Sequence, residues 1–116
     1  ATMIKNGVKL VVEAANMPCE QAAVDAFVDA GVSFGPAKAV NAGGVGVSGL
    51  EMSQNSARIA WEEAQLADML QSMMKSIHDS CVEYGEVSGG KVNYLQGANV
   101  AGFVKVAEAM LSYGHV

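Results

Sequence analysis

The segment Lys9-Leu10-Val11-Val12-Glu13-Ala14-Ala15-Asn16-Met17-Pro18 decides the fold of this 116-residue chain. Its first seven residues form a short, nearly continuous apolar run, and Asn16-Met17-Pro18 ends that run. Such a run is typical of a parallel strand that is buried on both faces. Asn favours a helix N-terminus and Pro is tolerated in the first helical turn, so we expect a helix from Pro18 onwards.

A helix and a second short strand are predicted to follow. Across residues 18–30, four apolar side chains recur at helical spacing: Ala23, Ala26, Phe27 and Ala30. Gly31 is suited to end this helix, and residues 32–36 predict the second strand. A strand, a helix and a strand in close succession form a βαβ unit with parallel strands and a right-handed crossover. The predicted fold class is α/β, with an incomplete parallel sheet followed by long C-terminal helices.

The two predicted strands place two asparagines at one edge of the sheet. In open parallel sheets, ligands bind beyond the carboxyl ends of the strands. These ends are expected at Ala15-Asn16 and across residues 36–41. Asn16 and Asn41 are therefore predicted to lie at the ligand edge, and Lys38 is a further candidate beside them.

Residues 41–52 read Asn-Ala-Gly-Gly-Val-Gly-Val-Ser-Gly-Leu-Glu-Met, with four glycines in nine residues. We interpret them as a glycine-rich loop that feeds a helix N-terminus, where Ser48 and free N–H groups suit a carboxylate or phosphate. A tightly packed connection without a ligand is the alternative. Gly44, Gly46 and Gly49 match G-x-G-x-x-G, but a weak preceding strand and the lack of a following acidic strand end exclude a pyrophosphate site.

The second half of the chain is predicted to be mainly helical. A stripe from Leu66 to Cys81 predicts a helix to about Tyr84, with its methionines as core filler. Residues 85–91 are expected to form a loop. A last helix is expected to open at residues 97–99 with Asn99 as its N-cap, and to end at Gly114. One stripe is predicted as its apolar face: Val100, Phe103, Ala107, Met110 and Leu111.

Composition excludes several functional classes. The net charge of −5 argues against nucleic-acid and anionic-membrane partners, and no apolar run is long enough to cross a bilayer. Cys19 and Cys81 lack C-x-x-C spacing, which indicates a reducing compartment, with the cytoplasm expected. Neither a metal site nor a set of catalytic residues is predicted. The 51 % hydrophobic content and the start without Met lead us to expect a truncated chain that buries surface against other residues.

Three blocks of sequence resemble one enzyme family. They are residues 13–18 (Glu-Ala-Ala-Asn-Met-Pro), residues 41–45 together with 48–55, and residues 96–107 (Gln-Gly-Ala-Asn-Val-Ala-Gly-Phe-Val-Lys-Val-Ala). In this order they closely resemble the C-terminal part of glutamate dehydrogenase, and the likeness covers nearly the whole chain. The last block is most similar to the shorter, hexameric, mostly NADP-linked microbial branch.

The resemblance implies an activity and a set of site residues. The activity is oxidative deamination of L-glutamate to 2-oxoglutarate and ammonia, with NADP as cofactor and NAD as the alternative. Asn16 would lie by the nicotinamide ribose and Asn41 by the nicotinamide carboxamide. Ser48 would hydrogen-bond the side-chain carboxylate of the substrate, and Val45 would line that pocket. The catalytic lysines and aspartate of the family belong to an N-terminal domain, so this chain supplies none.

The resemblance also implies a domain assignment and partners. Residues 1–116 would be the C-terminal portion of the dinucleotide-binding domain, with the βαβ unit and glycine loop in about 1–60 and the C-terminal helices in about 61–116. The partners would be the remainder of the same enzyme chain and a homo-hexamer, and the free chain would be inactive. The alternative is a small non-enzymatic module that self-associates, as a dimer, through its exposed sheet edge.

Overall fold

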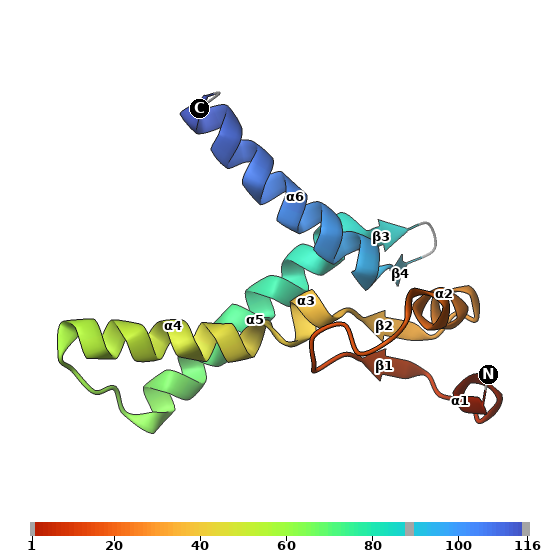
Figure 1. Cartoon of the computed structure of the whole chain (residues 1–116), viewed down its shortest axis with the longest axis horizontal. Coiled ribbons are helices and arrows are strands. Elements are labelled where there is room, and N and C mark those ends of the chain that lie inside the picture. Colours follow the sequence, from red (N-terminus) through yellow and green to blue (C-terminus); the bar gives the residue numbers. More distant parts are fainter. Residues whose placement is uncertain (1, 88–89, 115–116) are drawn as a thin grey trace.

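The N-terminal part of the chain is a βαβ unit. The computed structural model describes residues 2–87 and 90–114. Helix α1 (Thr2–Lys5) precedes strand β1 (Leu10–Val12), helix α2 (Gln21–Asp29) and strand β2 (Ser33–Gly35). The two strands pair in parallel, with Val11 opposite Phe34, and α2 lies beside them (Figure 1). The predicted α/β class and the parallel strand pair are confirmed.

A small core fills the space between α2 and one face of the sheet. Its buried members are Val24, Phe27, Val32 and Phe34. The rings of Phe27 and Phe34 stack with their centroids 6.3 Å apart, and Val11 packs against the cluster from β1. Because side chains alternate along a strand, Leu10 and Val12 point to the other face, where they are 60 % and 55 % exposed. The prediction that both faces of the first strand are buried is wrong within the described chain.

Helix α2 begins at Gln21, later than the predicted start at Pro18. Met17 has a φ of 47°, in the left-handed region, and therefore cannot belong to a right-handed helix. Glu20, with extended backbone, is the residue before the first helical turn. Asn16 and Pro18 consequently lie in a loop that joins β1 to α2.

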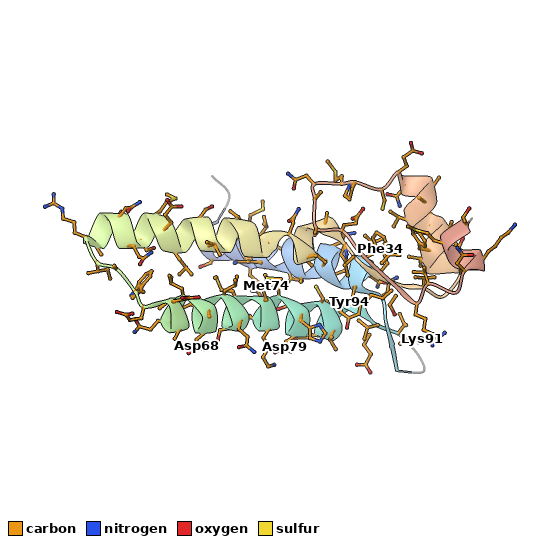
Figure 2. The ribbon with its side chains drawn as sticks, turned by 90° about the horizontal axis from the view of Figure 1, so that it is seen from below. Phe34, Asp68, Met74, Asp79, Lys91 and Tyr94 are labelled. Atoms are coloured by element: carbon orange, nitrogen blue, oxygen red, sulfur yellow. The ribbon has the colours of Figure 1, made fainter. Side chains whose placement is uncertain are left out.

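The glycine-rich stretch is a helix, so the predicted loop is wrong. Helix α3 (Ala37–Val40) is followed directly by α4 (Ala42–Ala57), which contains all four glycines, and α5 (Glu63–Gly85) runs beside α4 (Figures 1 and 2). A Cβ at Gly43 would lie 3.3 Å from Met74 Sδ, and one at Gly46 would lie 3.1 Å from Met73 Cε. These glycines allow close packing of two helices, which outweighs their low helix propensity.

The long helix α5 and its methionines follow the prediction. Glu62 precedes the helix and forms a capping box with Gln65, which satisfies free N–H groups of the first turn. The predicted stripe of apolar residues through Cys81 lies on this helix, and Met73 and Met74 are half-buried against α4. The helix and the role of these two methionines as core filler are confirmed.

The connection to the last helix differs from the prediction. Strands β3 (Glu86–Val87) and β4 (Lys91–Val92) form an antiparallel hairpin where a loop was expected; residues 88–89 of that loop lie outside the described chain. Helix α6 (Tyr94–Tyr113) starts earlier than expected, because Asn93 accepts a hydrogen bond from Gln96 N at 3.0 Å as its N-cap. The prediction that Asn99 caps this helix is wrong, whereas the stop at Gly114 is confirmed.

Much of the apolar surface of helix α6 is exposed to solvent. Its first turns pack on α5, where Gly97 and Ala98 are buried, and its second half extends away from the other elements (Figure 1). Phe103 and Leu111 of the predicted apolar face are 72 % and 84 % exposed. The accessible surface is 8535 Å², compared with about 6000 Å² for a compact monomer of this mass. Within the described residues, no helix is both long and apolar enough to cross a membrane.

Gly97 is predicted to be essential for the contact between α5 and α6. A Cβ there would overlap the carbonyl oxygen of Cys81 and lie 2.9 Å from its carbonyl carbon. Gly97→Ala should therefore lower the free energy of unfolding by about 3 kcal/mol, measured by urea denaturation followed by circular dichroism. The matched control is Gly102→Ala in the same helix, where a Cβ meets no atom within 4 Å. This control should stabilise the helix by up to about 1 kcal/mol, and equal effects of both variants would contradict the prediction.

Candidate functional site

The two predicted ligand-edge asparagines lie together. Asn16 belongs to the loop after β1, and Asn41 joins α3 to α4. Asn41 Nδ2 donates to Asn16 Oδ1 at 2.8 Å and lies 3.4 Å from the carbonyl oxygen of Ala15. Among the described contacts, the amide NH2 of Asn16 and the carbonyl oxygen of Asn41 have no partner of their own. The pair therefore presents one donor and one acceptor side by side, which complements a carboxamide or a sugar hydroxyl.

A buried carboxylate joins the two segments that carry this pair. Glu13 is 6 % exposed. Its Oε1 accepts from the backbone N–H of Cys19 at 3.1 Å, and its Oε2 accepts from the N–H of Ala37 at 3.0 Å. Glu13 is not among the site residues predicted from the sequence, although an acidic residue at the end of an apolar strand run is a signal that could have identified it.

Helix α4 aligns the other predicted site residues with Asn41. Positions 41, 45 and 48 are four and three residues apart, which places them on one face of a helix. Val45 is 73 % exposed and Ser48 is also exposed. The separation between residues 41 and 48 along the helix axis is about 10 Å. The face thus runs from the asparagine pair through an apolar position to a hydroxyl.

Ser48 is not at a helix N-terminus, so that prediction is wrong. Because α4 begins at Ala42, Ser48 lies in its second turn, beyond the free N–H groups of the first turn. The Ser48 hydroxyl donates to the carbonyl oxygen of Gly44 at 3.2 Å. Any hydrogen bond from Ser48 to a ligand would come from this exposed hydroxyl, which can rotate away from Gly44.

Lys38 connects the ligand edge to the last helix. Its ammonium group donates a hydrogen bond to the side-chain carbonyl of Asn99 on α6. Lys38 lies three residues before Asn41 and so shares its side of the helical run. Lys38 and Asn99 lie 61 residues apart in the sequence, and only the fold brings these two side chains together.

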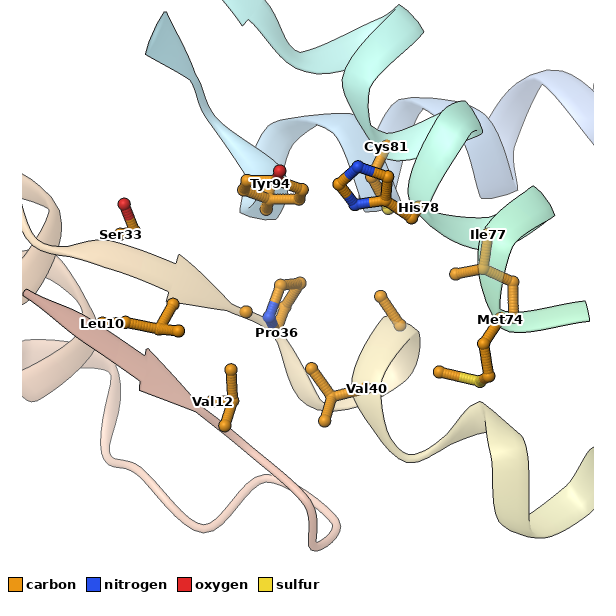
Figure 3. Close-up of a pocket in the computed structure, with 12 residues that line it drawn as sticks. Leu10, Val12, Ser33, Pro36, Val40, Met74, Ile77, His78, Cys81 and Tyr94 are labelled. Atoms are coloured by element: carbon orange, nitrogen blue, oxygen red, sulfur yellow. The ribbon is translucent and has the colours of Figure 1, made fainter. Parts of the chain in front are cut away.

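A separate cavity of about 410 Å³ borders the uncovered face of the sheet. Leu10 and Val12 face it from β1, and Met74, His78 and Tyr94 face it from α5 and α6 (Figure 3). The rings of His78 and Tyr94 lie 5.6 Å apart at their centroids. In the part of the chain that the structure describes, no three His, Cys, Asp or Glu side chains gather as metal ligands. The cavity is mainly apolar and does not include the asparagine pair.

Comparison with known proteins relates this arrangement to one family. A family model described as Glutamate/Leucine/Phenylalanine/Valine dehydrogenase matches residues 1–114. An NADP-specific glutamate dehydrogenase of an unknown prokaryotic organism is 57 % identical over 98 % of this chain and 25 % of its own length. The NADP-specific glutamate dehydrogenase of Salmonella typhimurium is 55 % identical over 97 % of this chain and 25 % of its own length.

Comparison with solved structures gives the same result. A crystal structure of Plasmodium falciparum glutamate dehydrogenase is similar over 98 % of this chain and 25 % of that chain, with a TM-score of 0.90 and 40 % sequence identity. The chain thus spans about a quarter of the length of the relatives it matches. The family resemblance seen in the sequence is confirmed.

The two cysteines should be poorly reactive in the folded chain. Burial raises the pKa of the Cys81 thiol, which is 2 % exposed. Burial, a hydrogen bond to Glu13 and the charge of Glu13 raise the pKa of the Cys19 thiol. Alkylation by iodoacetamide near pH 7.5 should be slower than in the urea-unfolded chain, slowest at Cys81, and should accelerate as the pH rises and thiolate forms.

The alkylation rates of Cys19 and Cys81 are measured by mass spectrometry of samples taken at successive times. Because the thiol pKa values are higher in the folded chain, the two protonated thiols stabilise the fold. This stabilisation is fully present below the unfolded pKa of about 9 and is lost as the pH rises through the raised pKa values of the folded chain. Labelling of Cys81 at the unfolded rate at neutral pH would contradict the prediction.

Proposed function

Because the chain belongs to the glutamate/leucine/phenylalanine/valine dehydrogenase family, we propose that it forms the cofactor- and substrate-contacting C-terminal part of a glutamate dehydrogenase. The enzyme would oxidise L-glutamate with water to 2-oxoglutarate and ammonia, and the nicotinamide cofactor would accept the hydride. The observation that carries this proposal is the hydrogen-bonded pair of Asn16 and Asn41 at the carboxyl ends of two parallel strands.

We assign the cofactor contacts to the asparagine pair. The acceptor oxygen of Asn41 suits the NH2 of a nicotinamide carboxamide, and the amide NH2 of Asn16 suits a ribose hydroxyl. Donation from Asn41 to Asn16 at 2.8 Å orients both groups before the cofactor arrives. NADP is the proposed cofactor because the two relatives described above are named NADP-specific, and NAD is the alternative.

We assign the substrate contacts to the exposed face of α4. The hydroxyl of Ser48 would donate to the side-chain carboxylate of glutamate, a bond to a charged group worth about 1.5–3 kcal/mol. Val45, one turn closer to the asparagine pair, would pack against the methylene groups of the same substrate. Catalytic acid–base groups would come from elsewhere in the enzyme, so the isolated chain would be inactive.

The remaining three quarters of such an enzyme are the proposed partner. Residues 1–116 would be the C-terminal portion of its dinucleotide-binding domain, divided near residue 60. The excess accessible surface of about 2500 Å² is larger than the area that one partner buries in a standard protein interface. We propose that the rest of the subunit covers it, that subunits form a homo-hexamer, and that the enzyme works in the cytoplasm, since Cys19 and Cys81 are free thiols.

A self-associating, non-enzymatic module is the second candidate. The observation in its favour is the exposure of Leu10 and Val12 on β1, whose only strand partner in the described chain is β2. A two-stranded sheet of this kind is marginal in water and offers an edge to a second copy. Light scattering of the isolated chain across concentrations distinguishes the candidates, since the module requires a stable dimer.

A chimera tests the enzymatic proposal directly. The matching quarter of the Salmonella typhimurium enzyme is replaced by this chain, and glutamate-dependent formation of NADPH and of NADH is measured from the absorbance at 340 nm. We expect activity, with NADP preferred over NAD. A folded chimera of the parental assembly size that does not oxidise glutamate would refute the proposal.

In this chimera, Ser48→Ala should raise the KM for glutamate by about ten-fold or more, since a bond of about 1.5 kcal/mol or more is lost. The KM for NADP should change less than about two-fold, because the asparagine pair is intact. Asn41→Ala should show the reverse pattern. The matched control is Ser53→Ala, since Ser53 lies on another face of α4 and donates to Gly49 O at 2.8 Å much as Ser48 donates to Gly44 O. Equal changes in both KM values for Ser48→Ala would remove Ser48 from the substrate pocket.

A further inference from the structure

We propose that Glu13 is a positioning residue that sets the placement of Asn16 relative to Asn41, an inference that rests on the cofactor role proposed for this pair. Glu13 touches neither asparagine through a described hydrogen bond. It acts instead on the two segments that carry them, through one carboxylate oxygen each.

The first carboxylate oxygen closes the loop that carries Asn16. Glu13 lies at the end of the β1 run, where its own N–H donates to the carbonyl oxygen of Gly35 at 3.0 Å. Its Oε1 accepts from Cys19 N at 3.1 Å, so the side chain spans the loop and leaves Asn16 near its middle. Met17 adopts a left-handed φ of 47° in the same loop. Such a backbone persists only where its surroundings hold it, and the Glu13 bond supplies that restraint.

The second carboxylate oxygen holds the helical run that carries Asn41. Its acceptor bond comes from the N–H of Ala37, the first residue of α3. Pro36, the residue before the helix, forms no side-chain cap. Glu13, which follows β1, accepts the hydrogen bond that a local capping residue would otherwise accept. Asn41 lies one turn further on and is fixed to this start by its N–H bond to Ala37 O at 2.8 Å. One buried side chain thus holds both members of the pair.

The contacts of Glu13 require a carboxylate. Among the residues that the structure describes, no cation forms a salt bridge with Glu13. Each of its carboxylate oxygens accepts a hydrogen bond from one backbone N–H, and the Cys19 thiol also donates to this carboxylate. Two acceptor oxygens match the two backbone donors. A glutamine of the same size has one oxygen and one NH2, so it must turn a donor towards either Cys19 N or Ala37 N.

The test uses the chimeric dehydrogenase in four forms besides the parent: Glu13→Gln, Glu20→Gln, Asn41→Ala and the double variant Glu13→Gln with Asn41→Ala. Glu20 is the control, because it is an exposed carboxylate in the same loop and makes no cap bond. The Kd for NADPH is measured by fluorescence titration, together with the KM for glutamate. Deuterium exchange of residues 14–19, residues 36–41 and α5 is followed by mass spectrometry.

If Glu13 acts by positioning the asparagine pair, the effects of Glu13→Gln and Asn41→Ala on NADPH binding should not be additive. Glu13→Gln should weaken NADPH binding by about ten-fold, the effect of losing one hydrogen bond to a charged group, with less than two-fold change in the KM for glutamate. The double variant should bind no more than two-fold more weakly than Asn41→Ala alone, and Glu20→Gln should match the parent. The proposal would be overturned if the fold-changes in Kd of the two single variants multiply in the double variant. An unchanged Kd for NADPH in Glu13→Gln would also overturn it.

Deuterium exchange tests the positioning role of Glu13 independently of the proposed function. Glu13→Gln should accelerate exchange in residues 14–19 or 36–41, whichever loses its bond, and leave α5 unchanged. Unchanged exchange in both segments, or faster exchange throughout, would refute the positioning role irrespective of activity. If Asn41→Ala leaves NADPH binding unchanged, the cofactor role of the pair fails, while local exchange still decides whether Glu13 holds the two segments.

Discussion

The βαβ unit and the start of the helical run depend on one buried charge. Removing a carboxylate from water is costly, and the cost is offset only where hydrogen-bond donors surround it. Glu13 meets this condition with the N–H groups of Cys19 and Ala37, which lie in the loop after β1 and at the start of α3. The parallel pairing of β1 with β2 brings Glu13 close to the start of α3, and the Glu13 carboxylate then joins the sheet, the loop and the helix start.

The helical run from α3 to α4 serves two purposes with its two sides. One side carries Gly43 and Gly46, whose missing side chains admit Met74 and Met73 of α5. The other side bears Asn41, which is half-buried, and Val45 and Ser48, which are exposed to solvent. Close packing fixes the first side against α5, and a binding surface needs such support to hold directional groups at fixed spacing.

The exposed apolar surface accounts for the unusual composition. The described cluster of buried hydrophobic side chains lies between α2 and the sheet, and few other hydrophobic residues are buried, although half of the chain is hydrophobic. Leu10 and Val12 on the second face of β1, and Phe103 and Leu111 on α6, remain in contact with water. A protein rarely tolerates so large an apolar surface unless another surface covers it, which agrees with a chain that matches a quarter of its relatives.

The sequence by itself determined the parallel strand pair, the long helix α5 and the meeting of Asn16 with Asn41, because these follow from local apolar periodicity and from the common edge of parallel strands. The sequence blocks that resemble glutamate dehydrogenase also predicted the correct family without any coordinates. Only the tertiary structure decided that the glycine stretch is helical, since packing against α5 outweighs backbone propensity. It alone joined Glu13 to Ala37 and Lys38 to Asn99, because contacts across 24 and 61 residues leave no periodic signal in the chain.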